Sequence, residues 1–231
     1  MIDKRTSIEK ALERVRDGDR VMVGGFGVPG TPFTLINGLL GKGTRGLTLI
    51  KNEANEDGMG LSRLIEAGRA RKLICSHLGL NATVIGMMNR KEIDVEFYPQ
   101  GILAEKIRAG GAGLMGILTD IGLDTILENE KQCIEIEGKR ALVEPALRAD
   151  AAFIHAFMAD DFGNLVYQKS ARNFNPLMAT AADTVIAEVE AIVDTGDLDP
   201  EHVHTPGAFV DHVVVMEEIT SEYEVLEHHA L

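Results

Sequence analysis

Tryptophan is absent from this 231-residue chain, aromatic residues make up only 5% of it, and basic residues are scarce beside acidic ones. The 23 lysines and arginines face 36 aspartates and glutamates, and the resulting net charge of −13 argues against nucleic acid as a partner. No apolar run is long enough to span a membrane and no signal peptide is evident, so we expect a cytoplasmic protein without membrane contact. Hydrophobic residues still reach 45%, so aliphatic side chains must build the core.

Cysteine is nearly absent as well. Cys75 and Cys133 are the two cysteines, and their spacing fits neither a metal site nor a redox motif. We therefore expect no bound metal, and we expect Cys75, which lies in an apolar run, to be a small core residue.

Glycine, by contrast, is concentrated in one stretch, DGDRVMVGGFGVPGTP at positions 17–32. Val21–Val23 predicts a short buried strand, and the glycines that follow allow a tight turn with close backbone approach to a ligand. Thr31 as N-cap and Pro32 as first helical residue then predict a helix. A strand, a glycine loop and a helix N-terminus in this order would present free N–H groups to an anion.

Two alternatives remain open for this loop. Gly25, Gly27 and Gly30 match the dinucleotide pattern G-x-G-x-x-G, and Glu53 follows the next apolar run where a ribose-binding acid would sit. An NAD-dependent Rossmann-type oxidoreductase is therefore one alternative, although prolines inside the turn, such as Pro29, fit that pattern poorly. A tight turn with only a structural role is the other.

Apolar periodicity predicts the remaining elements. Thr6 and Glu9 form an expected capping box for a first helix with one apolar face. The predicted strands are 21–23, 47–50, 73–76, 93–97, 152–155, 165–167, 185–189 and 213–215, with a hairpin around Gly138. We expect one α/β domain over 1–216, with an open, largely parallel sheet flanked by helices and an added antiparallel portion. Residues 217–231 are predicted to be a charged, exposed tail.

The pattern that extends on both sides of the glycine loop is more specific than either alternative. An Asp-Gly pair, two residues, three apolar residues, Gly-Gly-Phe, three residues, Gly, one residue and Pro resembles the signature of family I CoA-transferases. The likeness is to the α (A) subunit of the 3-oxoacid or acetate-acetoacetate type. Other segments also resemble that subunit: YPQG at 98–101, EKIRAGGAG at 105–113, GNL at 163–165 and SARNFN at 170–175. The resemblance runs from about Ile8 to about Val215 and implies a CoA-transferase-like fold.

The resemblance implies that CoA moves between a short-chain acyl-CoA and a carboxylate, possibly a 3-oxoacid such as acetoacetate, through a glutamyl-CoA thioester. Coenzyme A would be a substrate, with no permanently bound cofactor. In this family the nucleophilic glutamate lies in a Glu-Asn-Gly motif of the β (B) subunit, whereas this chain has Glu128-Asn129-Glu130 in a charged stretch. We therefore expect a β-subunit partner, in an α2β2 assembly, that completes the active site.

The resemblance also points to site residues. Gln100 is expected to position the acyl group or its oxyanion, because an amide donates without adding charge. Asn52 is the second positioning candidate. The segment related to the family's CoA site comprises Gly24, Gly25, Phe26, Gly27, Val28, Pro29 and Gly30.

Other polar residues have less specific expectations. Glu53 departs from the family's common second asparagine and is predicted to be a solvated or paired carboxylate, not the nucleophile. Lys169 and Arg172 would balance the anionic CoA, with surface ion pairs as the alternative. His77 and His155 are predicted to be satisfied core or surface histidines. Residues 119–125 also depart from the family pattern, which would alter the substrate if that loop contacts the acyl group.

Overall fold

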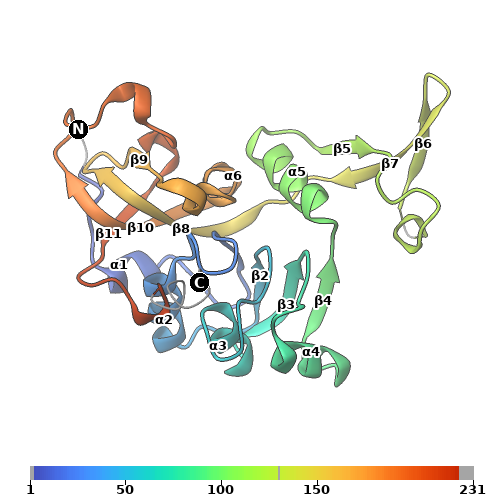
Figure 1. Cartoon of the computed structure of the whole chain (residues 1–231), viewed down its shortest axis with the longest axis horizontal. Helices are drawn as coiled ribbons and strands as arrows, with labels where there is room; N and C mark the ends of the chain where they lie inside the picture. The colour runs from blue at the N-terminus through green and yellow to red at the C-terminus, as the bar shows by residue number, and fades with distance from the viewer. Residues whose placement is uncertain (1–2, 130, 224–231) are drawn as a thin grey trace.

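A mainly parallel sheet forms the body of the computed structural model, which describes residues 3–129 and 131–223 (Figure 1). Its strand order is β11-β10-β8-β1-β2-β3-β4, each pair being parallel, and β9 adds to β8 in the antiparallel direction. The strands are β1 (Arg20–Val23), β2 (Leu47–Ile50), β3 (Ala70–Cys75), β4 (Asp94–Phe97), β8 (Ala149–Asp160), β9 (Leu165–Val166), β10 (Ala182–Val193) and β11 (His212–Val215). The predicted fold class is confirmed.

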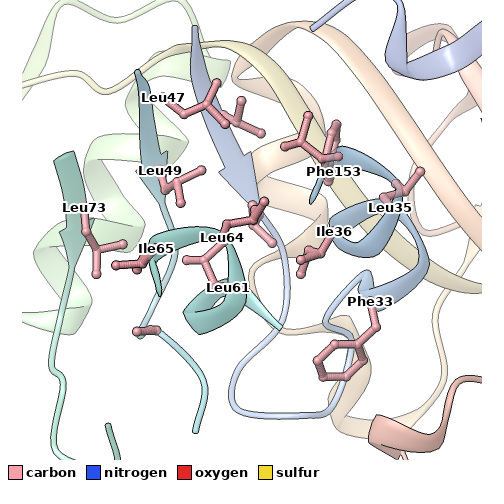
Figure 2. Packing of buried hydrophobic residues seen from close by; sticks show 14 of the residues in the cluster. Phe33, Leu35, Ile36, Leu47, Leu49, Leu61, Leu64, Ile65, Leu73 and Phe153 are labelled. Atoms are coloured by element: carbon pink, nitrogen blue, oxygen red, sulfur yellow. The ribbon is translucent and has the colours of Figure 1, made fainter. Parts of the chain in front are cut away.

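Helices cover the two faces of this sheet. The helices are α1 (Ile8–Leu12), α2 (Phe33–Lys42), α3 (Leu61–Glu66), α4 (Ala82–Asn89), α5 (Gln100–Gly111) and α6 (Asn175–Thr180). The first four share one hydrophobic cluster with the sheet, whereas α5 and α6 pack into a second cluster. Figure 2 shows the first cluster, in which aliphatic side chains of α2 and α3 pack against strand residues such as Leu49 and Phe153. Cys75 is buried there, as predicted.

A second, antiparallel sheet projects from the body beyond α5 (Figure 1). It consists of β5 (Gly116–Thr119), β7 (Lys139–Pro145) and β6 (Cys133–Ile136), and β6 and β7 form the predicted hairpin around Gly138. Strand β5 was not predicted, because its residues follow a glycine-rich stretch and are only partly buried. Within residues 3–129 and 131–223, no helix is both long and apolar enough to cross a membrane.

Two predicted helix starts are wrong by one residue. Ser7, not Thr6, is the N-cap of α1, since its side chain accepts from the backbone N–H of Lys10. Helix α2 begins at Phe33 with Pro32 as the N-cap residue. The hydroxyl of Thr31 donates instead to the carbonyl of Gly27, at 2.7 Å, and so closes the glycine loop.

The predicted exposed tail begins with ordered contacts. A short helix, η5 (Ser221–Tyr223), returns to the body, and the ring of Tyr223 packs edge-on against Phe33 with centroids 5.1 Å apart. The prediction of an exposed end is therefore wrong at Tyr223. Residues 224–231 lie outside the described residues, and the boundary at 216 stays a prediction.

The carboxyl ends of β1, β2, β3 and β4 all lie along one edge of the sheet, because these strands are parallel neighbours. The chain also changes winding direction between β1 and β8: α2 follows β1 on one face, and α6 follows β8 on the other. Ligands of open α/β sheets bind at such a switch point, outside the carboxyl ends of the strands. The glycine loop leaves β1 at this point.

Candidate active site

The glycine loop folds onto itself and needs glycine for steric reasons. Gly25 has a φ of +95°, and a Cβ there would lie 2.1 Å from the Thr31 hydroxyl oxygen. The carbonyl of Gly27 accepts from the Thr31 hydroxyl and from the Asn55 amide, both at 2.7 Å. Within the described part of the chain, the backbone N–H groups of Gly25, Val28 and Gly30 have no acceptor. The loop is thus rigidly held and still offers uncommitted donors.

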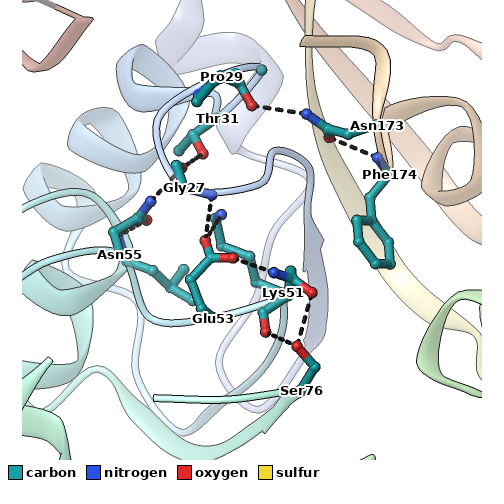
Figure 3. Close-up of polar contacts among 12 residues, drawn as sticks. Gly27, Pro29, Thr31, Lys51, Glu53, Asn55, Ser76, Asn173 and Phe174 are labelled. Atoms are coloured by element: carbon teal, nitrogen blue, oxygen red, sulfur yellow. Dashed lines mark hydrogen bonds and ion pairs between the residues drawn. The ribbon is translucent and has the colours of Figure 1, made fainter. Parts of the chain in front are cut away.

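Two asparagines from a distant segment fix the far side of this loop. Asn173 donates to the carbonyl of Pro29 at 2.9 Å, and Asn175 donates to the carbonyl of Gly30 at 3.0 Å (Figure 3 shows the first). A Cβ on Gly24 would lie 1.8 Å from the Asn175 side-chain oxygen, so this glycine admits the anchor. Sequence reasoning missed this anchoring role. The available signal was the pair of asparagines at 173 and 175, separated by one residue.

The N-terminus of α2 does not offer a free anion site. The buried carboxylate of Glu188 on β10 accepts from the backbone N–H of Leu35 at 2.9 Å. A dinucleotide fold needs this helix terminus for a pyrophosphate. The expected presentation of the helix N-terminus to a ligand is therefore wrong, because the chain supplies its own anion.

Glu188 is in turn paired with His155 on β8. The His155 ring contacts Glu188 through Nδ1 and Glu190 through Nε2, each at 3.1 Å, and Tyr223 approaches Nδ1 at 3.0 Å. Burial alone would lower the pKa of His155, but the hydrogen bonds and charges of the two glutamates outweigh it and raise this pKa to about 9. His155 is only 2% exposed, so the prediction of a satisfied core histidine is confirmed.

A buried ionic cluster follows β2. Glu53 is 4% exposed and Lys51 is fully buried, and the two form an ion pair. The Glu53 carboxylate also accepts from the backbone N–H of Gly27 at 3.1 Å and from the Asn52 amide at 2.6 Å (Figure 3). Burial lowers the pKa of Lys51, and the charge of Glu53 opposes that shift. Glu53 is thus paired, as one of the two predicted states, and is not solvated.

Asn52 and Gln100 meet at the same edge. The side-chain oxygen of Asn52 accepts from Gln100 Nε2 at 3.0 Å and from the Ser76 hydroxyl at 2.9 Å. Asn52 is fully buried, whereas Gln100 is exposed as the first residue of α5. Because an amide nitrogen carries two hydrogens, Gln100 keeps one donor for a ligand. Ser76 also lies 3.1 Å from Nδ1 of the half-buried His77.

Lys169 and Arg172 lie beside the loop anchor on a short helix, η2 (Lys169–Arg172), directly before Asn173. Both residues lie at the surface, and neither forms an ion pair with any described residue. Residues 119–125 begin at the last residue of β5 in the projecting sheet, and their contact with a substrate stays a prediction. Of the Glu128-Asn129-Glu130 stretch, Glu128 pairs with Arg140, and Glu130 lies outside the described residues.

Comparison with known proteins identifies relatives over almost the whole chain. A family model described as Coenzyme A transferase matches residues 5–216. The chain is 48% identical to the alpha subunit of an acetate CoA-transferase from Escherichia coli K12, covering 94% of this chain and 99% of that protein. It is 44% identical to the A subunit of a 3-oxoadipate CoA-transferase from Pseudomonas putida, over 94% and 95% of the two chains.

Solved structures agree with this result. An acyl-CoA transferase from E. coli O157:H7, solved as a thioester complex with CoA, superposes with a TM-score of 0.86 at 25% identity. The match covers 95% of this chain and 50% of that one, so the chain spans about half of that enzyme's length. Glutaconate CoA-transferase from Acidaminococcus fermentans shares the fold, with a TM-score of 0.82 at 21% identity over 92% of this chain and 75% of that one. The Rossmann oxidoreductase alternative finds no support in these comparisons.

Proposed function

The chain belongs to the coenzyme A transferase family, and on that premise we propose that it is the α subunit of a heteromeric CoA-transferase. The reaction would move CoA between a short-chain acyl-CoA and a carboxylate, with a 3-oxoacid as the candidate acceptor or donor. The observation that carries this proposal is the convergence of Gln100, Asn52 and the glycine loop at one sheet edge. The relatives named above, which belong to an acetate and a 3-oxoadipate CoA-transferase, support the substrate class.

The nucleophile is proposed to come from a partner β subunit. The partner's glutamate oxygen attacks the thioester carbonyl, the CoA thiolate leaves, and a mixed anhydride forms. The thiolate then attacks the glutamyl carbonyl, which releases the carboxylate and leaves a glutamyl-CoA thioester. This chain has no Glu-Asn-Gly motif, and Glu53 is committed to Lys51, Gly27 and Asn52. Both relatives are named as alpha or A subunits, which is consistent with a partner, and we retain α2β2 as the expected assembly.

Each attack creates an oxyanion, which needs fixed donors. The free amide hydrogen of Gln100 is the donor that we assign to the acyl oxygen, since Gln100 is exposed and oriented by Asn52. Asn52 is buried and therefore acts by positioning Gln100. The loop from Gly24 to Gly30 is proposed to contact CoA through its uncommitted N–H groups.

Reconstitution tests this proposal. We expect the purified chain alone to show little or no CoA-transferase activity, and mixing with its cognate β chain to restore turnover in a stable complex. Incubation of the complex with acyl-CoA, borohydride reduction and peptide mapping should place the reduced glutamate on the β chain. Robust activity of the isolated chain, or a reduced residue at Glu53, would overturn the assignment. A cytoplasmic location stays a prediction.

A further inference from the structure

The carboxylate of Glu53 joins the two parts of the candidate site. One oxygen, Oε1, accepts from the backbone N–H of Gly27 in the glycine loop at 3.1 Å. The other, Oε2, accepts from the Asn52 amide at 2.6 Å, and Asn52 accepts from Gln100 at 3.0 Å. A continuous chain of hydrogen bonds therefore runs from the loop backbone to the exposed amide that we assign to the acyl group.

Burial makes this chain of contacts rigid. Glu53 and Lys51 are 4% and 0% exposed, so water cannot replace either partner. With Nδ2 held by Glu53 and Oδ1 held by Ser76 and Gln100, the Asn52 amide has one orientation that satisfies every partner. If that amide turned over, its NH₂ would face the NH₂ of Gln100, two donors in contact. The carboxylate thus fixes which face Asn52 presents to Gln100.

We propose that Glu53, neutralised by Lys51, is a positioning residue that couples the CoA loop to Gln100: it holds Gly27 directly and orients Gln100 through Asn52. The inference rests on the proposed role of Gln100 in the transfer reaction. It explains why this chain carries an acid after Asn52 together with a buried lysine two residues earlier. Glu53 would then have two separate effects, one on the glycine loop through Gly27 and one on the Gln100 amide through Asn52.

The test removes both charges together, since a lone buried Lys51 or Glu53 would threaten folding. The double substitution Lys51→Met/Glu53→Leu is compared with wild type and with Gln100→Ala, in the reconstituted complex, by kcat and by the KM for acyl-CoA. We expect the pair replacement to lower kcat about tenfold in the wild-type background, because a small misplacement of a positioning group is costly. In the Gln100→Ala background it should lower kcat less than about twofold, since the group that Glu53 orients is gone. The rise in KM, which acts through Gly27, should be the same in both backgrounds.

The matched control is a second buried lysine–glutamate contact, between Lys106 and Glu144 at 2.9 Å, in which Glu144 also pairs with Lys131. Lys106→Met/Glu144→Leu perturbs the same helix, α5, that begins at Gln100. If the Lys106–Glu144 contact is only structural, this replacement should change kcat by the same factor in the wild-type and in the Gln100→Ala background. Thermal unfolding and complex assembly are measured for every variant.

The outcomes are distinct. If the Lys51/Glu53 replacement lowers kcat equally in both backgrounds, or leaves kcat unchanged, the coupling is refuted while the proposed function stands. If Gln100→Ala retains wild-type kcat, the assigned role of Gln100 fails and the coupling fails with it. If the variants assemble but the glutamyl thioester maps to this chain, the proposed partner nucleophile fails independently of the kinetic cycle.

Discussion

The contact between His155 and Glu188, beside the helix that follows the glycine loop, predicts that the folded chain loses stability as the pH rises. The pair lies where α2 begins, since Glu188 also accepts from the Leu35 N–H. The perturbation is a rise in pH from 6 to 9.5. It should weaken this contact and, through it, the start of α2 that follows the loop.

The direction of the stability change follows from the direction in which the pKa of His155 is shifted. The pKa of His155 is raised from an ordinary value of 6.5 to about 9, so the folded chain binds more protons than the unfolded chain between these two values. The stabilisation is therefore complete below pH 6.5 and is lost as the pH rises through 9. At 1.36 kcal/mol for each pKa unit, the shift corresponds to roughly 3 kcal/mol. Because His155 and Glu188 are coupled, this loss belongs to the pair.

Urea unfolding at constant ionic strength, at several pH values between 6 and 9.5, measures the effect. The comparison variant is His155→Gln/Glu188→Gln, which removes both charges and keeps an acceptor for Leu35. Wild type should lose roughly 3 kcal/mol of unfolding free energy more than this variant over the range. His202→Gln, at an exposed histidine, is the control and should follow the wild-type curve. Parallel curves for wild type and the double variant would refute the reasoning.

Two further predictions concern the loop and its neighbouring cations. Gly25→Ala places a Cβ 2.1 Å from a hydroxyl oxygen and should cost at least ~2 kcal/mol of unfolding free energy and raise the KM for acyl-CoA. In Gly27→Ala the new Cβ has no neighbour closer than 4.0 Å, so this variant should lose only about 1 kcal/mol of unfolding free energy. Equal losses for the two variants in thermal unfolding would contradict the packing argument. Lys169→Ala/Arg172→Ala should raise the KM for acyl-CoA about fivefold at low salt and less at high salt. The control is Arg90→Ala, which removes an arginine that is already paired with Glu92 and should leave the KM for acyl-CoA unchanged. An unchanged KM in the Lys169→Ala/Arg172→Ala variant would exclude Lys169 and Arg172 from CoA binding.

Local patterns were sufficient for most of the strands, whereas the site candidates Gln100 and Asn52 came from the family resemblance. Val21–Val23 and Leu47–Ile50 are short, largely apolar runs bounded by glycine or polar residues, and both lie in strands of the parallel sheet. The parallel strands of one sheet bring their carboxyl ends to the same edge, so Asn52, which follows β2, and Gln100, which follows β4, meet although they are 48 positions apart in the sequence. The predictable part of the site is the part that strand ends alone position.

The remaining features depend on pairings that no local pattern contains. Glu188 reaches the N–H of Leu35 across a sequence separation of 153 residues, and it replaces the ligand anion that the loop pattern predicted. The burial of Glu53 is likewise matched by its contacts with Lys51 and Gly27. In the sequence, both glutamates look like ordinary charged residues, because burial and partner are tertiary properties.

These two buried carboxylates also bear on how an acidic chain would accept an anionic substrate. Glu53 contacts the glycine loop at Gly27, Glu188 contacts Leu35 in the helix that follows the loop, and each carboxylate is neutralised at contact distance, by Lys51 and by His155. Neither therefore projects a full negative charge toward the loop, and the chain's net charge of −13 overstates the local repulsion. The same carboxylates occupy the Gly27 N–H and the α2 terminus, which leaves the N–H groups of Gly25, Val28 and Gly30, among the described residues, as the uncommitted donors of the loop. Exposed cations outside the loop, or the partner β chain, would then supply the positive charge that balances the CoA phosphates. The salt dependence of the Lys169→Ala/Arg172→Ala variant distinguishes these two sources: a KM for acyl-CoA that responds to salt as strongly in the variant as in wild type would assign the phosphates to the partner.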